Sequence, residues 1–175
     1  MVSTFSRSPA GLVVRPLDTA DHEAVRRLHE RLNEYDTYMR FFTVYPAHLA
    51  ALAEAICVAD PSLYALGAFV DGTLAGVANY VALDVGDAPA EIEFALVVDD
   101  EYTMHGIGTL LLSLLTAAAR QHGVTPMRAE ILAQNAMVLK LIRDLGRSSA
   151  VHRDRAEMHL DLDLGDVPST AVAGG

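Results

Sequence analysis

The sequence has only one cysteine and far fewer positive than negative charges, and each shortage disfavours a class of protein. Cys57 is the single cysteine, so no intrachain disulfide can form and a reducing, cytoplasmic location is expected. Lys and Arg number 13 against 23 Asp and Glu, which gives a formal net charge of -10. Such an excess of carboxylates disfavours binding to nucleic acids or to anionic membranes. We find no apolar run of transmembrane length and no signal-peptide core.

The composition that is present predicts one domain with an aliphatic core. Hydrophobic residues make up 51% of the 175 residues and aromatic residues only 6%, and a chain of this length can bury a substantial core. We expect an N-terminal arm over residues 1–10, a single domain over 11–164 and a flexible tail over 165–175. The seven histidines lack the spacing of metal ligands, so no metal site is expected.

Hydrophobic periodicity predicts alternating strands and helices. Strands are expected at 12–17, 63–70, 74–83, 91–98, 127–133 and 158–164. Helices are expected after Asp18, after Pro46, and over 106–122 and 135–145. Asp71-Gly72 between two apolar runs is a strong hairpin signal. The order predicts an α/β (α+β) fold, a central mixed sheet flanked by about four helices.

The most informative segment is the glycine-containing loop His105-Gly106-Ile107-Gly108-Thr109, which opens the helix expected over 106–122. Glycines let a ligand approach the backbone closely, and a helix N-terminus offers unpaired N–H groups and a positive dipole end. These features suit a pyrophosphate, although an ordinary tight turn is the alternative. A dinucleotide-binding fingerprint would need a third glycine where Leu111 stands, and a phosphate-binding loop would need Gly-Lys-Ser/Thr.

The element order and this loop resemble the GNAT superfamily of N-acetyltransferases over residues 12–164. A Val-rich strand end, Tyr102 and the two glycines match its central motif, and a helix from Asn135 to Gly146 matches its second motif. Thr103 stands where Gln or Arg is usual, His105 where Arg or Lys is common.

A subgroup is also indicated. The segment Tyr38-Met39-Arg40-Phe41-Phe42 and the position of Glu93 are similar to bacterial protein-lysine acetyltransferase domains. Ile142 stands where many GNAT members carry the tyrosine that acts as general acid, so no general acid is identified.

The resemblance implies that acetyl-CoA is the co-substrate. Its pantetheine would pair with the strand backbone over 96–98, and its pyrophosphate would lie on the N–H groups of 105–109. The cofactor-binding residues implied are Leu96, Val97, Val98, Thr103, Met104, His105, Gly106, Ile107, Gly108, Thr109 and Asn135. For Asn135, a plain helix cap is an equal alternative.

Two carboxylates are candidates for the general base. Glu91 and Glu93 share one face of a strand because they are two residues apart. A lysine amine has a reference pKa of ~10.4, so it must lose a proton before it can attack. A carboxylate whose pKa is raised by partial burial could take that proton. We favour Glu93, with Glu91 second; the alternative is that both line a solvated strand face.

The function expected is acetyl transfer from acetyl-CoA to a primary amine by direct attack in a ternary complex. A protein lysine is the favoured acceptor, followed by a small amine such as a polyamine or an aminoglycoside. A catalytically silent acyl-CoA-binding regulatory module is the rival from another class. We expect a monomer or a homodimer.

Overall fold

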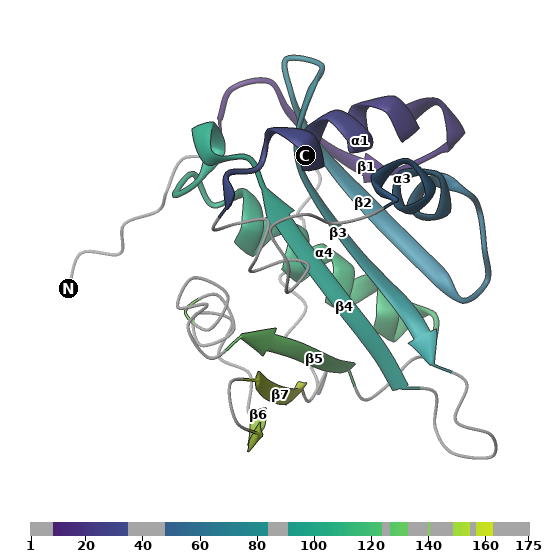
Figure 1. Ribbon diagram of the computed structural model, residues 1–175, viewed down its shortest axis with the longest axis vertical. Helices are drawn as coiled ribbons and strands as arrows, with labels where there is room; N and C mark the ends of the chain where they lie inside the picture. Colours follow the sequence, from purple (N-terminus) through teal and green to yellow (C-terminus); the bar gives the residue numbers. More distant parts are fainter. Residues whose placement is uncertain are drawn as a thin grey trace, which may run out of the picture.

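The computed structural model describes residues 9–34, 48–83, 91–123, 127–132, 140, 149–154 and 157–162, which contain a seven-stranded mixed sheet. Its strands are β1 (Leu12–Pro16), β2 (Leu63–Val70), β3 (Thr73–Leu83), β4 (Glu91–Val98), β5 (Met127–Leu132), β6 (Ser149–Asp154) and β7 (Glu157–Leu162). They lie in the order β1-β2-β3-β4-β5-β7-β6 (Figure 1). All neighbours are antiparallel except β4 and β5, which are parallel.

Helices cover both faces of the sheet. The described helices are the 3-10 turn η1 (Thr19–Asp21), α1 (His22–Arg31), α3 (Leu49–Cys57), the 3-10 turn η2 (Asp100–Tyr102) and α4 (Ile107–Gln121). Helices α1 and α3 pack together on one face, and α4 lies on the other (Figure 1). Strand alternation supplies both cores: Val77 packs toward α1 and α3, whereas Ala78 packs toward α4. The buried side chains are mostly aliphatic.

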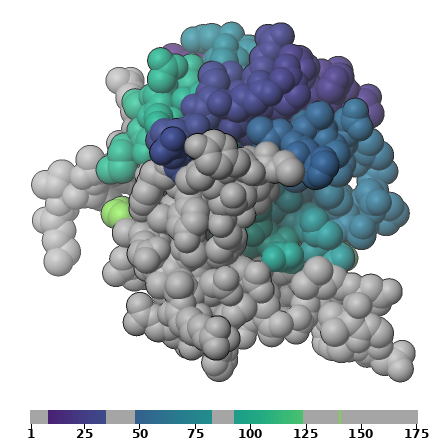
Figure 2. Space-filling view, viewed as in Figure 1, coloured from purple at the N-terminus to yellow at the C-terminus, as the bar shows by residue number. Residues whose placement is uncertain are grey.

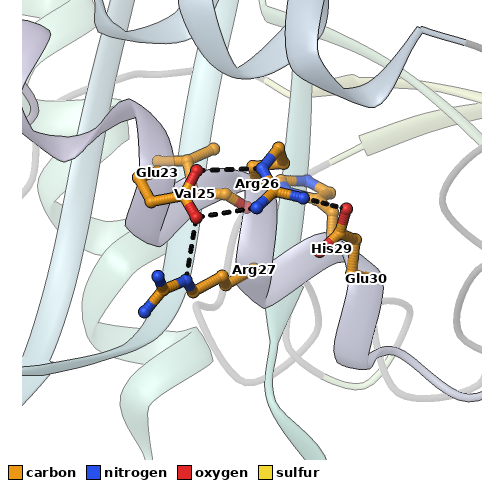
Figure 3. A network of polar contacts seen from close by, with 6 residues as sticks. All are labelled: Glu23, Val25, Arg26, Arg27, His29 and Glu30. Carbon is orange, nitrogen blue, oxygen red and sulfur yellow. Dashed lines mark hydrogen bonds and ion pairs between the residues drawn. The ribbon is translucent and has the colours of Figure 1, made fainter.

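The first helix begins as its cap residue predicts, with one added turn. The Asp18 carboxylate accepts a hydrogen bond from the Ala20 N–H, and the Asp21 carboxylate accepts one from the Asp18 N–H, so a capping box opens η1 before α1 starts. On α1 itself, Glu23 accepts hydrogen bonds from Arg26 and Arg27 (Figure 3). This network lowers the pKa of Glu23 to about 2, and it lies at the helix surface.

The predicted hairpin is confirmed. Asp71 has φ 48° and Gly72 has φ 82°, and positive φ at both central residues is the mark of a two-residue type I′ turn. The strands predicted at 63–70 and 91–98 are present with those bounds. The second predicted helix starts later than Pro46, at Leu49, where His48 adopts left-handed backbone with φ 67°.

One strand was not predicted. β6 pairs antiparallel with β7 along its whole length, but its sequence, SAVHRD, has no alternation of apolar residues. The expected helix at 135–145 lies outside the described residues apart from Lys140, which is helical. The tail, and the arm apart from residues 9 and 10, also lie outside them.

Candidate functional site

Strands β4 and β5 are paired only where each begins. Ile92 pairs with Met127 and Glu93 with Arg128, whereas β5 pairs with β7 along its whole length. Within the described part of the chain, no strand pairs with the β5-facing edge of residues 94–98, and Figure 1 shows the two strands running apart. Backbone N–H and C=O groups on that edge can therefore bind an extended ligand as an added strand would.

The loop that follows β4 is held by hydrogen bonds centred on Asp99. The Asp99 N–H donates to the carbonyl of Ala75 at 2.9 Å, and the Asp99 carbonyl accepts from the Tyr102 N–H at 2.9 Å. Thr103 donates its N–H to the Asp100 carbonyl at 3.2 Å and its hydroxyl to the Asp99 carbonyl at 3.3 Å. Both donors of Thr103 are thus engaged inside the loop. Tyr102 is partly buried and packs against the core on the α4 side.

The loop enters α4 through left-handed backbone. Met104 has φ 69° and Gly106 has φ 80°; the second value is one that a glycine adopts without strain. Gly106 is the N-cap residue, and no side chain caps this helix. The N–H groups of residues 107–109 therefore form a helix N-terminus with the positive end of its dipole, which is an anion-binding arrangement.

The first turns of α4 pack closely against Gly76 of β3. Ile107 and Leu111 are 1% and 0% exposed, and they pack over Gly76 of β3. A Cβ atom on Gly76 would lie 3.1 Å from both Leu111 Cδ1 and the carbonyl oxygen of Val97, and 3.4 Å from Ile107 Cγ2. The missing side chain at Gly76 lets the first turns of α4 approach the sheet beside the end of β4.

Glu93 lies on the opposite face of β4 from α4. Directly paired residues of an antiparallel ladder share a face, and Val97, four residues along β4 from Glu93, packs with the α1 and α3 core. Glu93 therefore points to the α1 and α3 side, at the residue where the pairing of β4 with β5 ends. Its side chain is exposed, so the described residues do not supply the partial burial expected for it.

A buried polar residue that sequence analysis missed lies beside Glu93. Asn79 of β3 is 7% exposed and pairs with Ala95, while the next residue on its face, Val81, pairs with Glu93. Asn79 and Glu93 are thus diagonal neighbours on one face. A polar residue inside the apolar run of β3 was a signal that could have marked this position.

Several predicted site residues are not tested by the described structure. Asn135, the segment 38–42 and the side chain of Glu91 lie outside it. Backbone geometry for residues 96–98 and 103–109 is described, and these residues converge at the end of β4 and the start of α4. His105 is exposed, and its Nδ1 lies 2.9 Å from the Thr103 carbonyl oxygen.

Other chemical roles find no support in the described residues. No cluster of three or more His, Cys, Asp or Glu able to hold a metal occurs among them, and none of the described helices is long and apolar enough to span a membrane. Cys57 is buried in the α1 and α3 core. Burial raises the pKa of its thiol to about 11, which leaves it unreactive as a nucleophile.

Comparison with known proteins identifies a matching family and similar solved structures. The acetyltransferase (GNAT) family model matches residues 21–146. The GNAT domain of S. lividans PAT is 24% identical, with a TM-score of 0.77, and the match covers 92% of this chain and 98% of that chain.

Two further structures are similar. YncA from Salmonella typhimurium, a putative acetyltransferase solved with acetyl-CoA, is 20% identical with a TM-score of 0.69, covering 93% of this chain and 99% of that one. The ribosomal-protein-S18-alanine N-acetyltransferase of Escherichia coli is 20% identical with a TM-score of 0.64, covering 91% and 98%. At these identities the structural likeness establishes a common fold.

Proposed function

Because the chain belongs to the GNAT acetyltransferase family and is thus an N-acetyltransferase that uses acetyl-CoA, we propose that it acetylates a lysine of a protein, with Glu93 as the general base. The observation that carries the proposal is that β4 and β5 stop pairing directly after Glu93. We call the resulting gap between the two strand backbones, alongside residues 94–98 of β4, the opening. An acyl chain lying in that opening would pass the one described carboxylate on β4 that faces α1 and α3.

The residues around the opening fit coenzyme A. Its pantetheine arm carries amide groups that can pair with the backbone edge of β4 at residues 96–98, with which no strand pairs among the described residues. Its pyrophosphate suits the uncapped N–H groups at the start of α4. The solved structure of YncA holds acetyl-CoA, which supports the same use of this fold here.

Glu93 has the chemistry that acyl transfer to an amine requires. The lysine side chain has a reference pKa of ~10.4, so at neutral pH nearly every lysine amine is protonated and has no free electron pair with which to attack. A carboxylate at the mouth of the opening can accept the proton, directly or through one water. Acetyl-CoA would supply the acetyl group: the C–N bond would form as the C–S bond breaks, the remaining extra proton on nitrogen would pass to the departing CoA thiolate, and Glu93 would return its proton to solvent.

The base assignment is tested by Glu93→Gln, which keeps the side-chain shape and removes the proton acceptor. The turnover rate should fall by about 10²–10⁴ at neutral pH. The deficit should shrink as pH rises, because more of the acceptor amine is already neutral. Glu91→Gln is the matched control on the same strand. Full activity in Glu93→Gln, with activity lost in Glu91→Gln, would assign the base to the other carboxylate.

A protein acceptor is favoured by the resemblance of residues 38–42 to protein-lysine acetyltransferase domains and by the fold shared with S. lividans PAT. A folded protein contributes binding energy from surfaces remote from the lysine, so free lysine and short peptides should be poor substrates. The test is mass spectrometry of a cell extract incubated with enzyme and acetyl-CoA. A few lysines should be acetylated well above the non-enzymatic background.

The alternatives give different outcomes in the same system. Strong turnover of a polyamine or an aminoglycoside, with no protein labelled above background, would replace the protein acceptor by a small amine. Binding of CoA without thiol release for any amine would indicate a silent acyl-CoA-binding module.

A further inference from the structure

The end of α1 is tied to the loop that precedes α4. Arg31, the last residue of α1, places Nη2 3.0 Å and Nε 3.1 Å from Oδ2 of Asp99, and Nη2 lies 3.4 Å from the carbonyl oxygen of Leu74. Two residues on, Asn33 donates from Nδ2 to Oδ2 of Asp100 at 2.6 Å. Figure 2 shows the teal surface of the loop region directly beside the indigo surface of α1.

Asp99 is the residue on which the loop conformation depends. Its backbone binds Ala75, Tyr102 and Thr103, as described above, and its Oδ1 accepts a hydrogen bond from the Glu101 N–H at 3.2 Å. The Asp99 side chain is only 13% exposed. Arg31 is the cationic partner of this shielded carboxylate, and a shielded charge is costly without such a partner.

We propose that Arg31 is a positioning residue for the co-substrate: by holding the Asp99 carboxylate, it fixes the loop that presents the α4 N-terminus to the CoA pyrophosphate. This inference rests on the co-substrate site assigned above. The tether also has a consequence for α1. Coupling between two sites is reciprocal, so a pyrophosphate that stabilises the loop must also stabilise the last turn of α1, on the face of the sheet toward which Glu93 points.

The same helix offers a matched control. Arg27 makes an ion pair with Glu23 at 2.9 Å (Figure 3), but its side chain is 66% exposed and Glu23 lies on the same helix. Arg27→Met and Arg31→Met thus remove the same charge and one ion pair each. Only the second variant removes a contact to the loop. Arg31→Lys keeps the charge and loses the planar fork.

The experiment is calorimetric titration with CoA, after circular dichroism has shown that each variant is folded. In Arg31→Met the dissociation constant for CoA should rise roughly three- to tenfold, the range between an exposed ion pair and a charge-assisted hydrogen bond. Arg31→Lys should recover part of the loss, and Arg27→Met should bind as the wild type does. An unchanged constant in Arg31→Met, or an equal loss in Arg27→Met, would overturn the proposal.

Hydrogen exchange tests the coupling itself. CoA should slow exchange of the amides of residues 28–33 in the wild type and in Arg27→Met, and it should not do so in Arg31→Met. A merely structural Arg31 would leave this CoA-dependent protection intact. A wild type that binds no CoA would refute the co-substrate site and the positioning role together. Normal wild-type binding with undiminished coupling in Arg31→Met would refute the positioning role alone.

Discussion

Gly76→Ala tests whether the start of α4 is seated on β3 as closely as the structure indicates. Two effects of opposite sign compete. Replacing a glycine by alanine where there is room stabilises a protein by about 0.4–1 kcal/mol, because the unfolded chain loses conformational freedom. Here the new methyl group would lie 3.1 Å from Leu111 Cδ1 and from the Val97 carbonyl oxygen. Both neighbours would have to move by a few tenths of an ångström.

The steric cost should exceed the entropic gain. The Leu111 side chain is fully buried, and the Val97 carbonyl belongs to β4, which pairs with β3 at Val77. Neither atom is the end of a mobile surface side chain. Overpacking of this kind costs about 1–3 kcal/mol, so the free energy of unfolding should fall by a net amount of roughly 1–2 kcal/mol.

Urea denaturation gives the measurement, with an unchanged m-value as the check that only stability moved. Leu111→Ala alone should cost about 2–5 kcal/mol through the cavity it leaves. The double variant Gly76→Ala/Leu111→Ala should cost at least ~0.5 kcal/mol less than the sum, because the new methyl group enters that cavity.

Gly72→Ala is the control for this cycle, since a Cβ there meets nothing within 4 Å and only its φ of 82° is strained. Its cost should therefore add to that of Leu111→Ala. A Gly76→Ala variant more stable than the wild type, or strict additivity with Leu111→Ala, would refute the close packing.

Two further predictions follow from groups whose pKa is shifted. Arg15 donates to both carboxylate oxygens of Asp21, at 2.7 and 2.8 Å, and this lowers the pKa of Asp21. The pair therefore stabilises the fold above the unfolded pKa of ~3.9, and the stabilisation is lost as pH falls through the folded value. Asp21→Asn should lower the free energy of unfolding at pH 7 by about 1–3 kcal/mol. It should also make the loss of stability in acid less steep than in the wild type. Urea denaturation at several pH values measures both effects, and an equally steep loss in the variant and the wild type would mean that the pair contributes nothing. Because burial raises the pKa of Cys57 to about 11, a thiol reagent at pH 8 should label it only as the protein unfolds, and rapid labelling of the native chain would contradict this burial.

Local chemistry explains why much of the fold was predictable. The two positive φ angles at Asp71 and Gly72 are what the pair Asp-Gly favours, and no distant contact is needed to specify them. The strand at 63–70 is a continuous run without charged residues, and the strand at 91–98 is apolar apart from Glu91 and Glu93, which fall on one face. The glycine at 106 marks the start of α4 because its backbone conformation is one that other residues resist.

Tertiary contacts explain why other features were not predictable. β6 is mostly polar, and it is identified as a strand only by its pairing with β7. Arg31 is separated from Asp99 by 68 residues, so nothing in the local pattern of α1 distinguishes it from Arg27, which pairs within the helix.

Alternate side chains of β4 point to opposite faces of the sheet, so one face packs against α4 and the other carries the candidate base. Phe94, Leu96 and Val98 pack toward α4, so they help to hold the helix whose first turn suits a pyrophosphate. Glu93 and Val97 face the other layer, which α1 and α3 provide. Because a one-residue slip in register would exchange the two sets, the β3–β4 ladder must be specified strongly. Its regular pairing from Gly76 with Val98 to Leu83 with Glu91 therefore sets the position of the candidate base relative to the α4 N-terminus.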